Sequence, residues 1–162
     1  MGDQLIEKGV DARVIAHSGW KEATNEIIRN RKKYGKRPVV LIGHSLGANA
    51  IIRMATHLKK ARIRVDYMAS FAATDPDPVP TNVRKFTNYY FKTDGWGDEI
   101  SAAKGFRGQL KNIDFSKDKQ VGHFNIDKQP RLQRQVINNV MRFVRKKKAT
   151  SRAAAKQTSD NG

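Results

Sequence analysis

Ser45 lies in a pattern of residues that can carry nucleophilic chemistry. Residues 38–50 read PVVLIGHSLGANA, in which a β-branched apolar run ends in GHSLG at residues 43–47 and a helix-compatible segment follows. A serine on a sharp strand-to-helix turn holds its hydroxyl clear of the sheet, and glycines two residues to either side let neighbouring backbone pass closely. We predict Ser45 as the nucleophile and the N–H of Leu46, at the helix start, as a donor to a developing oxyanion. The alternative is a tight turn in another α/β fold, with Ser45 as a helix N-cap.

This segment resembles the nucleophile elbow of the α/β-hydrolase superfamily, in its lipase, esterase and thioesterase branches. The resemblance covers most of residues 3–145, because a strand-end aspartate and a late histidine follow Ser45 in the superfamily's order. It implies a serine hydrolase that cleaves a carboxylic ester or thioester, from a small-molecule or lipid-like substrate. The reaction would use a Ser-His-Asp triad and an acyl-enzyme, with no metal and no organic cofactor. The elbow residues beside the serine are Gly43, His44 and Gly47.

His123 is the predicted general base among the four histidines of the chain. His44 adjoins Ser45, and adjacent side chains diverge, whereas His57 lies on the helix after the elbow and would face away from the site. His123 lies in VGHFNID, after the last expected strand and before the closing helix, where the superfamily places its catalytic histidine. There it would take the proton from Ser45 Oγ and later return it to the leaving group. The alternative is a loop histidine that hydrogen-bonds nearby backbone.

Two aspartates compete for the acid that orients this histidine. Asp75 follows the strand after the elbow helix, in an Asp-Pro step, and Asp94 follows the next strand. In the superfamily the acid comes more often from the later strand, but some lipase branches use the earlier one, with an Asp-Pro similar to this one. We favour Asp75, because the proline-stiffened segment would hold its carboxylate rigidly. Asp94 lies among small turn residues and would then only cap the turn.

The sequence departs from the superfamily near its start. The superfamily has a strand before the helix expected at residues 3–9, and the loop after that strand supplies a second oxyanion donor. Neither is expected from this sequence, which leaves three interpretations: a longer natural N-terminus, a decayed remnant, or a donor from Ser18 or Gly19. We favour the first. Loss of one such donor costs about 10²–10³ in rate, so the activity depends on which interpretation holds.

The expected elements alternate between strand and helix, which predicts an α/β fold. We expect a mostly parallel sheet of about five strands, flanked by helices on both faces and lacking the superfamily's early strands. Residues 1–147 would form this domain and residues 148–162 a basic disordered tail, because the last segment lacks an apolar face. The expected strands are residues 10–16, 38–43, 63–73, 82–91 and 110–115, and the expected helices are residues 3–9, 20–33, 46–60 and 129–146.

The chain is strongly basic, with 32 Lys and Arg against 15 Asp and Glu and a net charge of +17. Residues 142–162 hold seven basic residues and one acid, so +11 remains on the rest of the chain. Such a surface attracts nucleic acid, anionic lipid or acidic substrates. A second hypothesis is therefore a catalytically impaired binding protein with this fold, which uses its basic surface for nucleic acid or anionic lipid. Weak binding to anionic surfaces through the basic tail is compatible with either hypothesis.

Two groups of aromatic residues could either bind a ligand or pack in the core. Trp96, Phe106 and Phe124 would line an acyl pocket or belong to the core. The aromatics of the strand at 82–91 would form a stacking platform for single-stranded nucleic acid or, as we favour, pack in the core; they are Phe86, Tyr89, Tyr90 and Phe91.

The sequence shows no targeting or membrane signal. No apolar run approaches the ~20 residues of a membrane span, and the N-terminus lacks a signal-peptide pattern. We therefore expect a cytoplasmic location. The chain has no cysteine, so no disulfide and no thiolate metal site can form.

Overall fold

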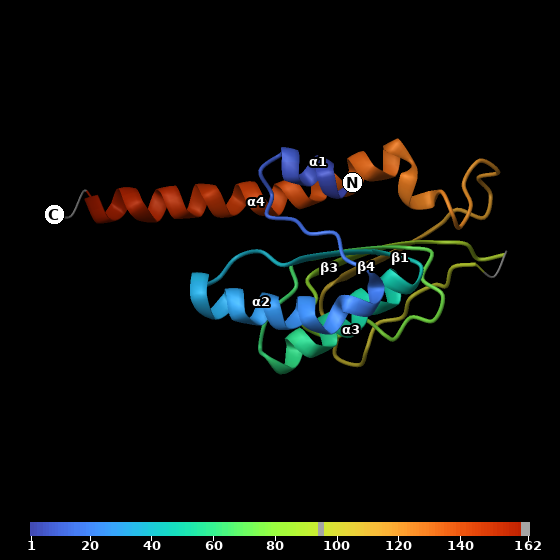
Figure 1. Ribbon diagram of the computed structural model, residues 1–162, viewed down its shortest axis with the longest axis horizontal. Coiled ribbons are helices and arrows are strands. Elements are labelled where there is room, and N and C mark those ends of the chain that lie inside the picture. The colour runs from blue at the N-terminus through green and yellow to red at the C-terminus, as the bar shows by residue number, and fades with distance from the viewer. Residues whose placement is uncertain (94–95, 160–162) are drawn as a thin grey trace.

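Four parallel strands form the centre of the fold (Figure 1). The computed structural model describes residues 1–93 and 96–159, and it describes side chains up to residue 145. The strands lie in chain order across the sheet, and every neighbouring pair is parallel. They are β1 (Val40–His44), β2 (Tyr67–Phe71), β3 (Lys85–Tyr90) and β4 (Gln109–Asp114).

Helices lie on both sides of this sheet (Figure 1). Parallel strands need crossover connections, and α3 (Leu46–Lys60) makes the crossover from β1 to β2. α2 (Trp20–Tyr34) packs beside α3 on one face, while α1 (Gly2–Glu7) and α4 (Pro130–Ser159) cover the other face. Two short 3₁₀ turns, η1 (His17–Gly19) and η2 (Ile126–Lys128), precede α2 and α4. The chain is thus an α/β protein with one all-parallel sheet.

The strands alternate their side chains between two buried clusters. Leu41, Met68 and Phe86 belong to the cluster under α2 and α3, whereas Tyr67 and Tyr89 belong to the cluster under α1 and α4. Burial on both faces explains why every residue of the inner strand β2 is buried, as expected for a parallel sheet, whereas the edge strand β4 is partly exposed. The four aromatics of the strand predicted at 82–91 are all buried, which agrees with core packing rather than a stacking platform; they are Phe86, Tyr89, Tyr90 and Phe91.

The strand predicted at residues 10–16 is wrong, so the sheet has four strands and not five. This segment is an irregular link from α1 on one face to α2 on the other (Figure 1). A strand needs a hydrogen-bonded neighbour for its backbone groups, and among the described residues no strand lies between this segment and β1. Val14 is 78% exposed as a result, so the apolar pattern here does not mark a core strand.

The closing helix is longer than predicted. α4 continues to Ser159, where the sequence led us to expect a disordered tail from residue 148, and residues 160–162 lie outside the described part of the chain. The added segment is rich in alanine, lysine and arginine, which have high helix propensity, so the helix continues without an apolar face to bury. The division into residues 1–147 and 148–162 stays a prediction.

Candidate active site

Ser45 occupies a strained turn between β1 and α3. Its backbone has φ 54° and ψ −122°, a region that non-glycine residues rarely adopt, and its N–H donates to the carbonyl of Phe71 at 2.9 Å. Position 43 has room only for glycine, because a Cβ there would overlap the backbone of Gly47. A Cβ at Gly47 would meet open space, so only one of the two glycines is explained by packing. The serine hydroxyl is therefore held at the carboxyl end of the sheet.

His123, which lies 78 positions further along the chain, is within hydrogen-bond distance of the Ser45 hydroxyl. Its Nε2 lies 3.1 Å from Ser45 Oγ, and its Nδ1 lies 2.7 Å from the carbonyl oxygen of Trp96. A carbonyl only accepts, so Nδ1 carries the proton and Nε2 presents its lone pair to the serine O–H. His123 is buried, with 8% of its surface exposed. This is the tautomer that a general base for Ser45 needs.

His44 ties the elbow to the loop that carries His123. Its Nε2 lies 2.6 Å from the carbonyl oxygen of His123, so the imidazole N–H donates to the backbone of its partner. The two rings lie 5.2 Å apart. His44 thus holds the backbone of His123 in place, which gives the second histidine next to the serine a structural role.

The first turn of α3 offers unpaired backbone donors beside Ser45. The first N–H groups of a helix have no intrahelical acceptor, and those of Leu46 and Gly47 occupy this position. The N–H of Ala48 already donates to the carbonyl of Ser45 at 2.9 Å. Leu46 begins α3 directly after Ser45, and its role as an oxyanion donor stays a prediction. Ser18 lies in η1, which packs against α3, and a second oxyanion donor from that turn stays a prediction.

The structure does not join Asp75 to His123 in the described part of the chain. Asp75 is exposed, and its N–H lies 3.4 Å from Oδ1 of Asn49, in the first turns of α3. The Nδ1 proton of His123 goes to the Trp96 carbonyl, which is a neutral dipole rather than a carboxylate. Asp94, the other candidate, lies outside the described residues. The identity of the acid therefore stays a prediction.

A row of polar side chains crosses three strands inside the sheet. Ser70, Asn88 and Asn112 occupy paired positions on β2, β3 and β4. Ser70 Oγ donates to Asn88 Oδ1 at 2.7 Å, and Asn88 Nδ2 donates to Asn112 Oδ1 at 2.9 Å. Ser70 and Asn88 are fully buried, and buried polar groups carry a large penalty when they lose their partners.

This row anchors the loop that orients His123. Asn88 Nδ2 also donates to the carbonyl of Asp98 at 2.9 Å, and Asn112 pairs with both the N–H and the carbonyl of Ile100, at 3.2 and 2.9 Å. These contacts hold the segment directly after Trp96. Sequence reasoning missed this row, although an asparagine within each of two predicted strands was a usable signal.

Two aromatic rings flank the base. Trp96 and Phe124 lie 5.2 and 5.1 Å from the His123 ring, and they are 56% and 73% exposed. They form an apolar rim at the Ser45–His123 pair. Phe106, the third aromatic predicted for an acyl pocket, packs against the buried cluster under α2 and α3 instead.

Comparison with known proteins identified no family model, no curated protein and no solved structure that matches this chain. Within residues 1–93 and 96–159, no group of three His, Asp or Glu side chains could hold a metal ion. None of the described helices combines the length and the apolar character that a membrane span requires.

Proposed function

We propose that this protein is a serine hydrolase that cleaves a carboxylic ester or thioester through an acyl-enzyme. The observation that carries the proposal is the 3.1 Å contact between Ser45 Oγ and the Nε2 of His123, with Nδ1 protonated against a carbonyl. A serine at a strained turn, a base in the correct tautomer and free N–H groups at a helix start are the parts that acyl transfer needs. The resemblance to the α/β-hydrolase superfamily, without its early strands, belongs to the same proposal.

Each step follows from this arrangement. His123 Nε2 takes the proton from Ser45 as Oγ attacks the acyl carbon, and the C=O π electrons move to the oxygen. The oxyanion forms beside the Leu46 N–H, whose partial positive charge favours it. The oxyanion then re-forms the C=O bond as the C–O or C–S bond to the leaving group breaks, and the imidazolium gives its proton to the departing oxygen or sulfur. An alcohol or thiol leaves, and an acyl-enzyme remains. Water attacks this ester in the reverse sequence of proton transfers, which releases the acid and restores Ser45.

The apolar rim favours substrates with a hydrocarbon acyl group. Trp96 and Phe124 present exposed ring surface next to the base, and contact with an acyl chain would remove this surface from water. Acyl chains of increasing length should therefore bind more tightly, by about 0.8 kcal/mol for each buried CH₂ group, until the chain passes the rim.

A fluorophosphonate probe tests the proposal, because it phosphonylates activated serines only. We expect labelling of the folded protein that is lost in Ser45→Ala and kept in Ser101→Ala, since Ser101 is an exposed loop serine. Mass spectrometry of the labelled peptide should place the adduct on Ser45. Folded protein that does not react, or labelling that persists in Ser45→Ala, would reject the assignment.

A further inference from the structure

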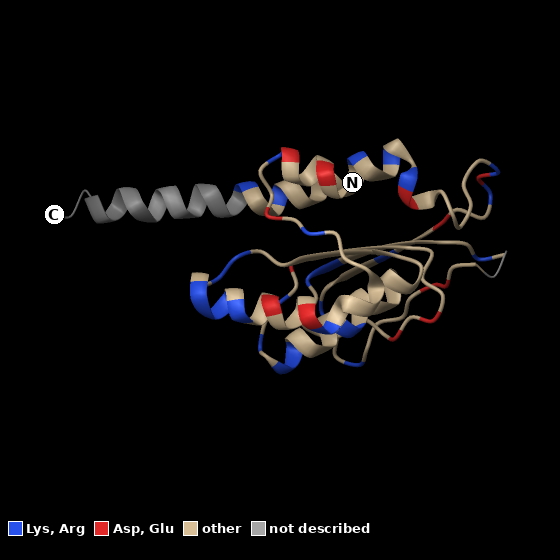
Figure 2. Ribbon diagram, in the orientation of Figure 1, with Lys and Arg blue, Asp and Glu red and all other residues tan. Residues whose placement is uncertain are grey.

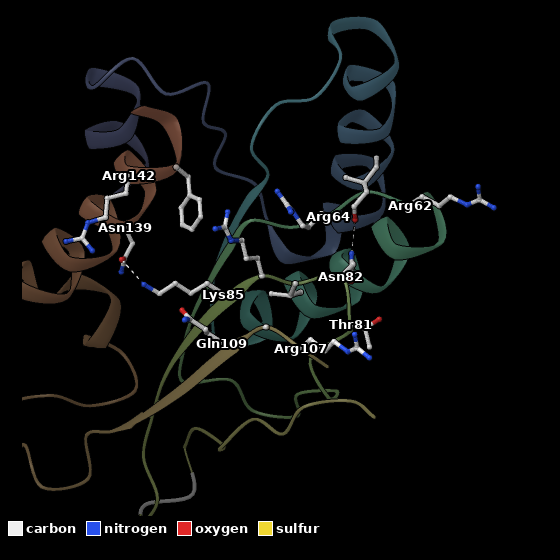
Figure 3. A pocket seen from close by; sticks show the side chains of 14 residues that line it. Arg62, Arg64, Thr81, Asn82, Lys85, Arg107, Gln109, Asn139 and Arg142 are labelled. Atoms are coloured by element: carbon white, nitrogen blue, oxygen red, sulfur yellow. Dashed lines mark hydrogen bonds between the residues drawn. The ribbon is translucent and has the colours of Figure 1, made fainter. Parts of the chain in front are cut away.

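A basic groove lies at the other end of the sheet from Ser45. It is an open cavity of about 730 Å³ between the starts of β2, β3 and β4 and the helix α4 (Figure 3). A neighbouring cavity of about 620 Å³ shares four residues with it, Lys85, Gln109, Asn139 and Arg142. The two cavities therefore form one channel along α4, which we call the basic groove.

Cations line this groove without matching carboxylates. The first cavity is lined by six of them, Arg62, Arg64, Arg84, Lys85, Arg107 and Arg142, and no Asp or Glu lines either cavity. Among the described residues, the only one of these six with an ion pair is Arg64, whose Nη2 lies 3.1 Å from Asp66.

Lys85, which lines both cavities, is held by neutral groups. Lys85 Nζ donates to Asn139 Oδ1 at 3.1 Å and lies 5.7 Å from the ring centre of Tyr67. Burial raises the pKa of Tyr67, so this phenol is neutral at physiological pH and does not offset the ammonium. In Figure 3, Lys85 extends from the strand side toward Asn139, and Arg142 lies beside Asn139 on α4. The cluster thus produces a positive electrostatic potential, which favours the binding of anions.

The shape of the groove favours a polymeric, phosphate-bearing ligand. It lies between strands and helix, and Lys85 is only partly exposed there, so a flat membrane surface would contact this cation poorly. It spans two adjoining cavities, and α4, which lines both of them, also carries the exposed Arg145 (Figure 1). The sequence that follows is basic as well. Amide side chains from α4, Gln135 and Asn138, line its other half and can hydrogen-bond sugars or base edges.

We propose that the basic groove binds single-stranded nucleic acid through its phosphates. A single strand is flexible enough to bring its phosphates to cations in both cavities, whereas a rigid duplex would contact mainly the outer ones. The proposal is independent of the hydrolase assignment, because the length of a five-residue strand, about 17 Å, separates the groove from Ser45. A nucleic acid in the groove therefore leaves the Ser45–His123 pair open.

Fluorescence anisotropy of the full chain with a labelled oligothymidylate of about 12 nucleotides tests this proposal. The groove variant is Lys85→Gln with Arg142→Gln, which removes two charges and retains polar side chains. The control is Lys117→Gln with Lys119→Gln, which removes two charges from an exposed loop at the opposite end of the sheet. Titrations between about 0.05 and 0.3 M salt give the slope of log K against log salt.

We expect the groove variant to bind about 25-fold more weakly at about 0.1 M salt and to lower the slope by about 1.4, the share of two phosphate contacts. The control should change affinity less than threefold, and Ser45→Ala should bind like the parent. Equal losses in the groove and control variants, or no binding at low salt, would overturn the proposal. So would a groove-dependent affinity for phosphatidylserine vesicles without affinity for the oligonucleotide, or equal affinity for a duplex of the same length.

Discussion

The two ends of the sheet are organised by different physical principles. At the carboxyl ends of the strands, short hydrogen bonds hold Ser45, His123 and His44 in one geometry, with strained backbone at the serine. At the amino ends, six cations line an open groove, and of these only Arg64 has an ion pair within the described part of the chain. Figure 2 shows Lys and Arg gathered where the strands begin. The carboxyl end of the sheet is thus organised by the exact positions of a few atoms, and the amino end by the number of positive charges.

This contrast implies that the two ends respond differently to substitution. Hydrogen-bond geometry is lost when one atom is removed, because a reacting pair must be aligned to within a fraction of an ångström. A charge cluster loses affinity in steps, because each cation contributes separately and salt screens all of them. Variants at the carboxyl end should therefore change rate or stability, and variants at the amino end should change salt-dependent binding.

Ser45→Ala should give the largest effect. Removal of the nucleophile is expected to lower kcat for a p-nitrophenyl ester by about 10⁴-fold or more, since a residual rate can come only from binding and the oxyanion donors. The stability of the protein should hold or rise, because the strained turn loses no core contact. Steady-state kinetics and thermal unfolding measure the two. An undiminished kcat would place the chemistry elsewhere.

Substitutions of the two candidate acids should have clearly different effects on kcat. We now expect the larger effect from Asp94→Asn, a loss of about 10²-fold in kcat, because Asp94 stands two residues before Trp96 in the sequence and the Trp96 carbonyl contacts His123 Nδ1. An acid that reached this nitrogen would stabilise the imidazolium. Asp75→Asn should cost less than about threefold, since its carboxylate is exposed and its described contact is through its N–H. The reverse ranking in the same ester assay would return the role to Asp75.

Asn88→Ala should destabilise the protein without touching either site directly. Its amide bonds Ser70, Asp98 and Asn112, so the substitution removes three hydrogen bonds and leaves the buried Ser70 hydroxyl without its partner. We expect a loss of about 2–4 kcal/mol in the free energy of unfolding, measured by urea titration. Lys85→Gln with Arg142→Gln should change it by less than about 1 kcal/mol, as expected for partly exposed positions. Similar losses in both variants would remove the contrast between the two ends.

His44→Phe should slow turnover about tenfold. The ring volume is kept, but the N–H that holds the His123 carbonyl is lost, so the base is aligned less often. The expected change is in kcat rather than KM, and His44→Gln should recover part of it by supplying a donor. A merely structural role would give no recovery by Gln and an equal loss of stability in both variants.

The smallest expected effect is a change in Tm caused by a substitution in the loop that precedes His123. A hydrogen bond from Arg131 lowers the pKa of Asp118 below its usual 3.8. A lowered pKa in the folded state adds stability that is present at neutral pH and is lost as pH falls through that pKa. Asp118→Asn should therefore lower Tm slightly at pH 7 and have no effect near pH 2. A constant difference across this range would show that the charge is irrelevant.

Local patterns in the sequence predicted the elbow well. The helix expected at 46–60 is α3 with the same bounds, and the strand before it is β1, because β-branched runs, glycines and helix formers act over a few residues. The strand expected at 10–16 failed for the opposite reason. A strand exists only beside a partner, and the partner is a property of the whole sheet.

The amino-acid sequence determined a serine at a tight turn, a histidine on a late loop and an excess of positive charge. The tertiary structure alone decided that His123 Nε2 faces Ser45, that a backbone carbonyl of Trp96 sets its tautomer, and that cations from loops 62–64, 81–85 and 107 meet α4 in one groove. Backbone conformation follows from neighbouring residues, whereas these meetings depend on how distant segments pack around a common sheet.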